Sequence, residues 1–237
     1  MPPDTNAPRL YVRDDLSEGA TVPGTPAQAH YLGNVMRLNA GAPVRLFNAR
    51  DGEFAATIAA LRKERLSFLV GQQTRRHADE AGAWLVFSPL KRDATDLVVQ
   101  KATELGAGAV LPVLCARTNA ARINTERLTA IAIEAAEQCE RLTIPTLHPP
   151  RRLAELLADW PGERILSVAM EREAGLPVAG HAESGALLVG PEGGFTPGEL
   201  DVMRATPFIQ PVSLGPRILR AETAAVVGLA LLQARHW

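Results

Sequence analysis

Hydrophobic residues follow two different patterns of spacing along the chain, and the pattern changes near residue 80. Before residue 70, apolar residues gather in short runs that are typical of β-strands, with turn signals such as "NARDG" between them. After residue 80, apolar strand-like runs alternate with segments whose apolar residues recur at helical spacing. We therefore expect a small β-barrel-like domain over residues 1–72, a polar linker over 71–82, and an α/β domain over 80–237.

The same pattern predicts the individual elements. In the first domain it predicts strands at 10–12, 44–47, 54–58 and 66–70 and a helix at 26–38. In the second it predicts strands at 84–90, 109–115, 164–170, 185–190 and 211–215, with helices at 93–106, 124–142, 199–206 and 222–237. Asp93 and Asn124 are the expected helix caps. Strands that are apolar on both faces and alternate with helices favour a parallel sheet.

Composition narrows the class of protein without identifying it. Of 237 residues, 46% are hydrophobic, which is enough for a sizeable core. No apolar run approaches the length of a membrane span, and the first residues lack the layout of a signal peptide. Cys115 and Cys139 stand apart from each other and from any histidine cluster. We expect free thiols, no metal site, no membrane association and a cytoplasmic location.

Two glycine-rich loops follow predicted strands and carry the most informative chemistry. They are "GPEGG" at 190–194, within "LLVGPEGGFTPGEL", and "LGPRILRAET" at 214–223. Glycines such as Gly193 and Gly194 let a ligand approach the backbone closely. A single Gly-Pro pair is typical of an ordinary turn. Two such loops at consecutive strand ends favour a shared pocket, because parallel sheets bind ligands at the carboxyl ends of their strands.

Neither loop has the pattern of a phosphate-binding loop. Gly-x-x-x-x-Gly-Lys is absent, and no Gly-x-Gly-x-x-Gly opens a helix. Glu192 would repel a phosphate. The loops therefore suit a neutral or cationic ligand, such as an adenosine that bears a sulfonium group. A small-metabolite α/β enzyme that binds a nucleotide is the disfavoured alternative.

The two loop motifs resemble, almost residue for residue, those of RsmE-type ribosomal RNA (uracil-N3)-methyltransferases of the SPOUT superfamily. The resemblance extends to "HYLGNVMRLNAGAPVRLFN", "VQKATELGAGAVLPV" and "IAIEAAEQCERLTIP". It implies S-adenosylmethionine (AdoMet) as cofactor, 16S ribosomal RNA or the small ribosomal subunit as partner, and a homodimer. It also implies a PUA-like N-terminal domain and a C-terminal domain with a trefoil knot. The chain departs from the family pattern at Ala49, Leu128 and Ala221.

The loops and the resemblance together define the candidate cofactor-binding residues. These candidate residues lie at and just after the ends of the predicted strands at 185–190 and 211–215. These residues are Val189, Gly190, Pro191, Glu192, Gly193, Gly194, Leu214, Gly215, Pro216 and Leu219.

Methylation of uracil N3 requires a proton acceptor and a donor that stabilises negative charge on the flanking oxygens. Arg220 is the candidate donor, and its alternative role is an ion pair with Glu222 or with a dimer partner. Glu192 is a candidate base or sulfonium contact, or a helix cap. Glu222 is either catalytic or a cap of the last helix. The sequence leaves the proton acceptor open, with solvent as one option.

Two groups of polar residues are candidates for RNA contact. Glu134, Gln138 and Arg141 share a predicted helical face, which is either solvated or turned to the site. His30, Asn34 and Arg37 share another face, and His30 is alternatively a structural histidine. A non-catalytic ribosome-assembly protein is the binding-module alternative. The RNA-binding candidates are Arg9, Arg13, His30, Arg37, Gln138 and Arg141.

Overall fold

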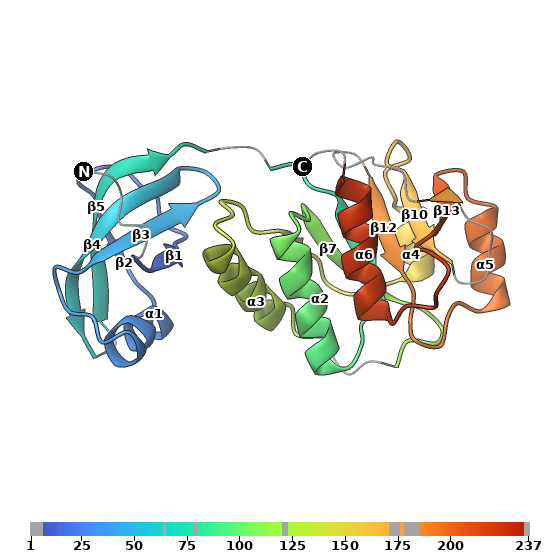
Figure 1. Ribbon diagram of the computed structural model, residues 1–237, viewed down its shortest axis with the longest axis horizontal. Coiled ribbons are helices and arrows are strands. Elements are labelled where there is room, and N and C mark those ends of the chain that lie inside the picture. The colour runs from blue at the N-terminus through green and yellow to red at the C-terminus, as the bar shows by residue number, and fades with distance from the viewer. Residues whose placement is uncertain are drawn as a thin grey trace. The chain divides into compact units, whose positions relative to one another are not determined.

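A computed structural model shows the fold (Figure 1). The chain forms two compact units, Met1–Asp79 with Ala136–Thr143, and Glu80–Ala135 with Ile144–Trp237. The first unit thus includes segment 136–143, which the sequence assigns to the second domain, and its main part ends at Asp79. Residues 78–79 of the expected linker and 235–237 of the expected last helix lie outside the described residues. The described residues are 7–63, 65–77, 80–119, 123–170, 176–177 and 185–234.

The first unit is built on a five-stranded sheet in the order β1-β3-β4-β5-β2. β1 pairs with β3 in parallel, and the other pairs are antiparallel. The expected linker begins too early, because residues 71–75 continue β5 and pair with β4. Among the strands that the structure describes in this unit, β2 alone lacks a predicted counterpart. The elements are β1 (Arg9–Tyr11), β2 (Thr21–Pro23), α1 (Pro26–His30), the π-helix η1 (Tyr31–Val35), β3 (Pro43–Asn48), β4 (Gly52–Arg62) and β5 (Arg65–Arg75).

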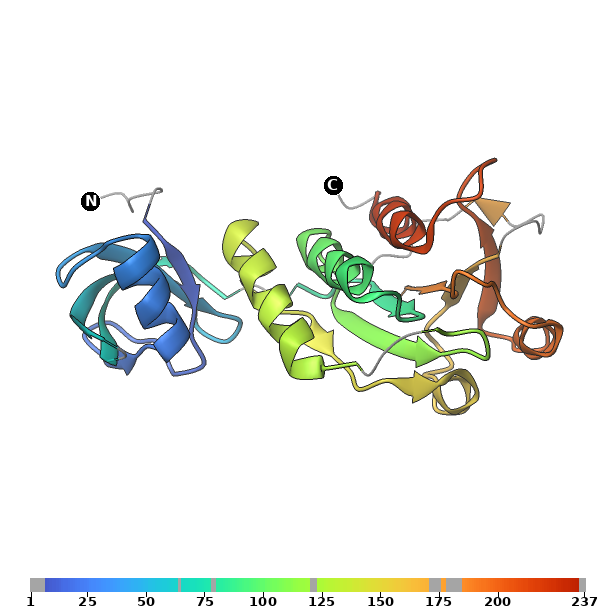
Figure 2. The ribbon, with the colours of Figure 1, turned by 90° about the horizontal axis from the view of Figure 1, so that it is seen from below.

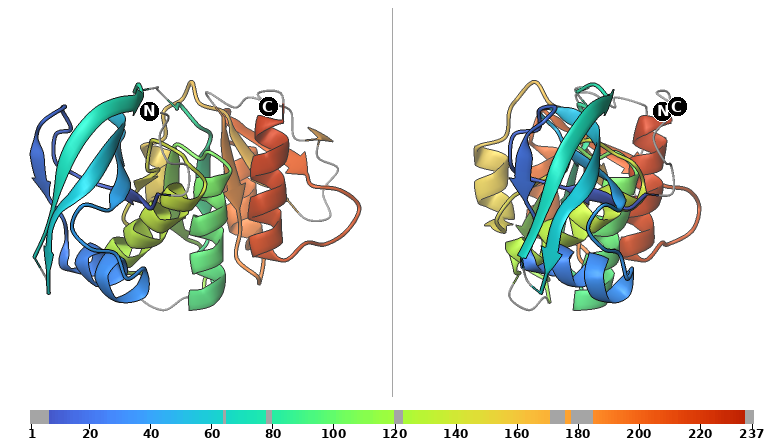
Figure 3. Two further views of the ribbon diagram at one scale, coloured as in Figure 1. Left: turned by 60° about the vertical axis from the view of Figure 1, so that its left-hand side comes forward. Right: turned by 90° about the vertical axis from the view of Figure 1, so that its left-hand side faces the viewer.

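The predicted helix at 26–38 is shorter and less regular than expected. Thr25 and Gln28 form a capping box at its start, and Pro26 occupies the first turn. After His30 the chain widens into the π-helix η1, and Arg37 then adopts a left-handed φ of 54° that ends the segment. Figure 3 shows α1 beside the end of the β4–β5 hairpin, where Leu61 packs close to Gly33.

The second unit is a parallel sheet in the order β11-β13-β10-β12-β6-β7-β8, with β9 pairing farther along β7. The strand pairs between its described residues are all parallel, as the sequence predicts. The elements are β6 (Trp84–Phe87), α2 (Arg92–Glu104), β7 (Ala109–Leu114), α3 (Thr125–Gln138), β8 (Thr146–Leu147), β9 (Arg151–Arg152), α4 (Leu153–Ala158), β10 (Leu166–Ala169), β11 (Leu176–Pro177), β12 (Ala186–Val189), α5 (Pro197–Arg204), β13 (Ile209–Ser213) and α6 (Ala221–Gln233).

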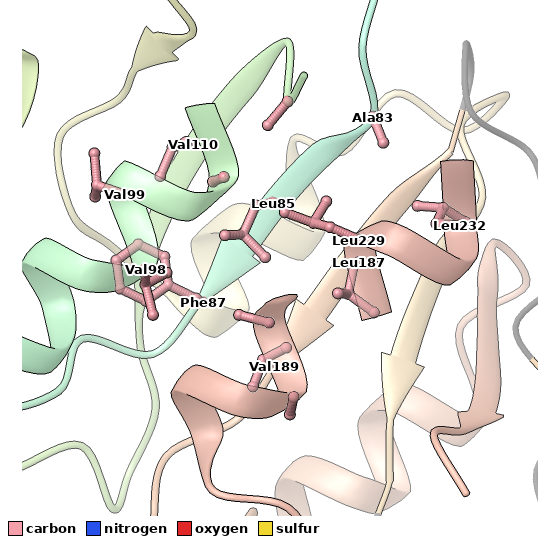
Figure 4. Packing of buried hydrophobic residues seen from close by; sticks show 14 of the residues in the cluster. Ala83, Leu85, Phe87, Val98, Val99, Val110, Leu187, Val189, Leu229 and Leu232 are labelled. Carbon is pink, nitrogen blue, oxygen red and sulfur yellow. The ribbon is translucent and has the colours of Figure 1, made fainter. Parts of the chain in front are cut away.

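Helices cover both faces of this sheet, and Figure 2 shows α2 and α6 on one face with α4 and α5 on the other. The side chains of β12 alternate between the two layers. Leu187 and Val189 pack with Leu229 of α6 in one hydrophobic cluster, which is drawn in Figure 4. Ala186 and Leu188 pack against the opposite layer. Both faces are therefore buried, which explains the uninterrupted apolar runs of the strands.

Helix starts were predicted with mixed success. Asn124 accepts a hydrogen bond from the Arg127 N–H at 3.0 Å, so it caps α3 as expected. Asp93 is not the cap of α2, which begins after Lys91 and places Asp93 in its first turn. The hydrophobic pattern did not predict β8, β9, β11 or α4. Among the described residues, no helix is long and apolar enough to cross a membrane.

Candidate functional site

Three parallel strands end at the same level at one edge of the second sheet. Ala169 of β10 is the register partner of Val189 in β12 and of Val212 in β13. The glycine loops follow β12 and β13. The sequence placed them at consecutive strand ends, but β10 lies between the two strands in the sheet. The loops therefore flank the end of β10.

A cavity of about 1160 Å³ opens at this edge. All ten candidate cofactor-binding residues line it, so the structure brings the two loops together as predicted. Their contact with a cofactor stays a prediction. The sequence missed Ala169 and Met170, although the strand that ends there was predicted, because the lateral order of strands was unknown. The other missed lining residues are Phe195, Leu200, Val212, Ser213, Arg217, Ile218, Ala221 and Ala224.

The first glycine loop is shaped by tight packing and by one left-handed residue. A Cβ on Gly190 would lie 2.7 Å from Cζ of Phe195, so a larger residue there would displace the ring. Gly194 has φ of +67°, and its N–H donates to the Pro191 carbonyl at 2.8 Å to close the turn. Glycine is required at both positions for different reasons, close packing at the first and backbone conformation at the second.

The loop runs into α5 through a capping box formed by Thr196 and Glu199, so the helix begins two residues earlier than the expected 199. The Thr196 hydroxyl accepts from the Glu199 N–H, and Glu199 accepts from the Thr196 N–H at 2.8 Å. The other Glu199 oxygen accepts from the Ala116 N–H at 2.7 Å. Burial would raise the pKa of Glu199, but these donors outweigh it and hold the pKa below its usual value. Glu199 is therefore an anion, and its hydrogen bonds fix the end of the loop.

The three candidate catalytic residues do not all reach the cavity. Arg220 and Glu192 line it and are exposed. Arg220 precedes the first turn of α6, and within the described ranges it forms no ion pair, with Glu222 or any other residue. Glu222 lies in the first turn of α6 and does not line the cavity. This placement favours its role as a favourable charge at a helix N-terminus.

The RNA-binding candidates divide into exposed and buried residues. Arg13, His30, Arg37 and Gln138 are exposed. Arg37 does not continue the helical face of His30 and Asn34, because the chain widens into η1 after His30 and Arg37 itself has a left-handed backbone. The Asn34 amide and His30 Nδ1 lie 2.8 Å apart and pair with each other.

The predicted RNA-binding role of two residues is wrong, because both are buried. Arg9 is 6% exposed, and its donors are used by Glu53 at 2.6 Å and by the carbonyls of Ala136 and Arg141. Its guanidinium also lies 3.5 Å from the centroid of the Phe47 ring. Arg141 is 7% exposed and lies beyond the end of α3, so it does not share the exposed face of Glu134 and Gln138. Neither arginine is placed to meet a phosphate.

A second, smaller cavity of about 450 Å³ lies beside Cys115 and α5. Burial, with the nearby Glu199 carboxylate, raises the pKa of the Cys115 thiol to about 12. The thiol is therefore protonated at neutral pH and packs as an apolar group. In the part of the chain that the structure describes, no three His, Cys, Asp or Glu side chains gather where they could hold a metal ion.

The fold and the site together define an RNA methyltransferase with a second, PUA-like domain. The model of an RNA methyltransferase domain matches residues 79–233, and that of an RNA methyltransferase PUA domain matches 25–70. The expected parallel α/β methyltransferase domain and the PUA-like domain are therefore confirmed. The chain belongs to the RNA methyltransferase family, with relatives named ribosomal RNA small subunit methyltransferase E.

Similarity to these relatives covers nearly the whole chain. The Rickettsia conorii protein of that name is 32% identical over 94% of this chain and 93% of its own length. The Bacillus subtilis protein is 30% identical over 93% of this chain and 92% of its own. A crystal structure of ribosomal RNA small subunit methyltransferase E from Neisseria gonorrhoeae, bound to S-adenosyl methionine, is also similar. It has a TM-score of 0.84 and 30% identity, over 97% of this chain and 98% of that one.

Proposed function

We propose that this chain is an AdoMet-dependent methyltransferase that methylates N3 of a specific uridine in the 16S RNA of the small ribosomal subunit. The observation that carries the proposal is the cavity where β10, β12 and β13 end, lined by both glycine loops. The Neisseria gonorrhoeae protein, similar over nearly its whole length, was crystallised with S-adenosyl methionine. Its name and those of the other relatives indicate the RNA substrate. We accordingly place the protein in the cytoplasm, with that substrate.

The cavity fits AdoMet in size and in chemistry. Its volume of about 1160 Å³ exceeds the roughly 300–1,000 Å³ of most ligand pockets, which leaves room for a nucleotide beside the cofactor. The glycine-rich lining exposes backbone groups that suit an adenine and an amino acid. Glu192 supplies a negative charge for the sulfonium, and no metal is required. Calorimetry with AdoMet should show the same affinity with and without a chelator.

AdoMet supplies an activated methyl group, and the residues of the chain must position the uracil and manage its charge. Loss of the N3 proton spreads negative charge onto the flanking carbonyl oxygens. Arg220 lines the cavity without an ion-pair partner in the described ranges, so its guanidinium is available to donate to such an oxygen. Among the described residues that line the cavity, Glu192 alone carries a carboxylate. It is the remaining candidate proton acceptor, alongside solvent.

The first unit is proposed to hold the RNA through exposed cationic and polar groups. Arg13 and Arg37 are exposed and would contact phosphates, which position RNA without reading its sequence. His30 and Gln138 are the other exposed candidates. Arg9 and Arg141 are removed from this surface because they are buried.

The trefoil knot and the homodimer remain proposals. The knot rests on the resemblance of the two loop motifs to those of SPOUT methyltransferases; α6, which follows β13, packs against β12 and β6. The dimer is supported by exposed apolar side chains at Ile218 and Leu231, at 63% and 43%. Light scattering at micromolar concentration should give about twice the chain mass of 25.4 kDa. A mass equal to that of one chain would contradict the dimer.

The substrate is tested most simply in cells. Ribosomal RNA from a strain that lacks this chain should lose N3-methyluridine at one position of 16S RNA, as measured by mass spectrometry. Restoration by the intact chain, and not by a cavity variant, separates an enzyme from a non-catalytic assembly protein. An unchanged methylation pattern in the deletion strain would contradict the proposal.

A further inference from the structure

The glycine loop after β12 is held from outside the cavity by Arg117, which no motif in the sequence singled out. Arg117 lies in the loop after β7 and does not line the cavity. We propose that Arg117 is a positioning residue that fixes the loop 190–195 in the shape that binds AdoMet. The inference rests on the proposed function, because it concerns how the same cavity is formed.

Two peptide groups of the loop are fixed at both of their ends. Nη1 of Arg117 donates to the carbonyl of Gly193 at 2.9 Å and to that of Phe195 at 3.4 Å. On the other side of these peptides, the Gly194 N–H donates to Pro191, and the Thr196 N–H donates to the Glu199 carboxylate, both at 2.8 Å. Because a peptide group is planar, fixing its oxygen and its N–H fixes its orientation.

Arg117 is itself held by a tight turn. The Cys115 N–H donates to the Thr118 hydroxyl at 2.8 Å, and the Thr118 N–H donates back to the Cys115 carbonyl at 3.1 Å. The Thr118 hydroxyl also lies 2.7 Å from that of Ser88, which follows β6. The Ala116 N–H donates to Glu199 at the start of α5. The turn that carries Arg117 is thus bound to two neighbouring parts of the sheet edge.

The side chain of Arg117 also packs against the loop. A Cβ on Gly193 would lie 3.4 Å from Cβ of Arg117, which is ordinary van der Waals distance. The methylene stem therefore covers the bare backbone of Gly193, while the guanidinium reaches the two carbonyls. A backbone rich in glycine loses more conformational entropy on ordering than any other. A loop that is ordered before the ligand arrives avoids this cost at binding.

The inference predicts an effect on AdoMet affinity that is separate from the chemical step. Arg117→Ala should raise the calorimetric Kd for AdoMet about tenfold, the loss expected for hydrogen bonds from a charged donor. Arg117→Lys should raise it about threefold, since an ammonium keeps the charge but not the planar fork. With both substrates saturating, single-turnover methyl transfer should stay within about twofold of wild type, because binding energy lost equally before and in the transition state leaves that rate unchanged.

Amide hydrogen exchange gives an independent readout without RNA. The N–H groups of Gly194 and Thr196 should exchange faster in Arg117→Ala than in wild type, and saturating AdoMet should reduce the difference. Arg92→Ala is the matched control, because Arg92 is exposed in the first turn of α2 and does not line the cavity. It removes the same charge and should change neither the Kd nor the exchange.

The outcomes separate this inference from the proposed function. If wild type fails to bind AdoMet, the proposed function is wrong. If wild type binds and both Arg117 variants bind equally well with unchanged exchange, the positioning role is wrong. The positioning role is also wrong if Arg117→Ala lowers the single-turnover rate at saturating substrates but leaves the Kd for AdoMet unchanged. Arg117 would then act on the reacting groups. Thermal melting of Arg117→Lys, which keeps the stem and the charge, shows whether the effect on affinity occurs in a folded protein.

Discussion

Ala169 and Val189 are register partners at the carboxyl ends of β10 and β12. Val212 of β13 pairs with Ala169 from the other side. The ends of these three strands therefore form the base of one cavity. The glycine loops that follow β12 and β13 lie on either side of the end of β10. The site depends on this lateral order, because the two loops would not enclose a common volume if β12 and β13 ended at different levels.

Gly190 provides a test of the packing that shapes this cavity. In Gly190→Ala, the new Cβ would lie 2.7 Å from the Phe195 ring, so the ring must move. Because Phe195 lines the cavity, this movement changes the shape of the cavity. Overpacking of this kind costs about 1–3 kcal/mol, and since the cost falls on the shape of the cavity that binds AdoMet, the affinity should fall by about five- to 150-fold. Calorimetry measures the change. Gly198→Ala is the control, because no atom lies within 4 Å of its added Cβ, and equal losses in both variants would contradict the packing argument.

Arg9 is predicted to stabilise the first unit rather than to bind RNA. In Arg9→Met, the buried Glu53 carboxylate loses its 2.6 Å partner, and its other ion-pair partners among the described residues, Arg45 and Arg75, lie farther away at 3.4 and 3.7 Å. Breaking a buried pair on one side typically costs about 3–5 kcal/mol, which denaturant unfolding would detect. Arg13→Ala removes an exposed arginine and should change the free energy of unfolding by less than about 0.5 kcal/mol. Equal stability of the two variants would show that the pair contributes little.

Arg37 is predicted to act through its charge on phosphates. Arg37→Ala should weaken RNA binding and reduce the slope of log affinity against log salt by about 0.7–1, as expected for one lost phosphate contact. Arg37→Lys keeps the charge and should keep the slope. Titrations of RNA at several salt concentrations give both values. A slope that is the same in Arg37→Ala and wild type would remove Arg37 from the RNA surface.

Arg220 is predicted to act mainly in the transition state. Arg220→Ala should retain AdoMet affinity, while the single-turnover rate with both substrates saturating falls about a hundred- to a thousandfold. Arg220→Lys should recover part of the rate, because one ammonium cannot reproduce the planar donor. Arg92→Ala, which removes an exposed charge outside the cavity, should turn over normally. A wild-type rate for Arg220→Ala would make Arg220 a binding or structural residue.

The sequence predicted the strands and the loop residues well where the signal was local. β12 is apolar at every position because alternate side chains enter two different hydrophobic layers, so its run of Leu187, Leu188 and Val189 was unambiguous. The ten candidate cofactor-binding residues line one cavity, and they were singled out because the glycines and prolines among them mark a backbone that must turn sharply. Strands of two residues, such as β8 and β9, have no measurable period and were missed.

What the sequence could not predict depends on partners far away in the chain. Arg9 was expected on the surface, and its burial follows from Glu53, 44 positions away, and from two carbonyls more than 120 positions away. Arg117 was missed for the same reason, because the carbonyls that it meets lie 76 and 78 positions later. Ala169 and Met170 were missed because only the fold places β10 between the two glycine loops.

The central claim is that this cavity transfers a methyl group from AdoMet to uracil N3 of small-subunit RNA. Small subunits from a strain that lacks the chain are the substrate for the direct measurement. They are incubated with the purified protein and AdoMet with an isotopically labelled methyl group, and the RNA is digested to nucleosides for mass spectrometry. The account predicts labelled N3-methyluridine from one position of 16S RNA with wild type, and about a hundredfold less at early times with Arg220→Ala. Label on a different nucleoside, or no label with wild type, would contradict it.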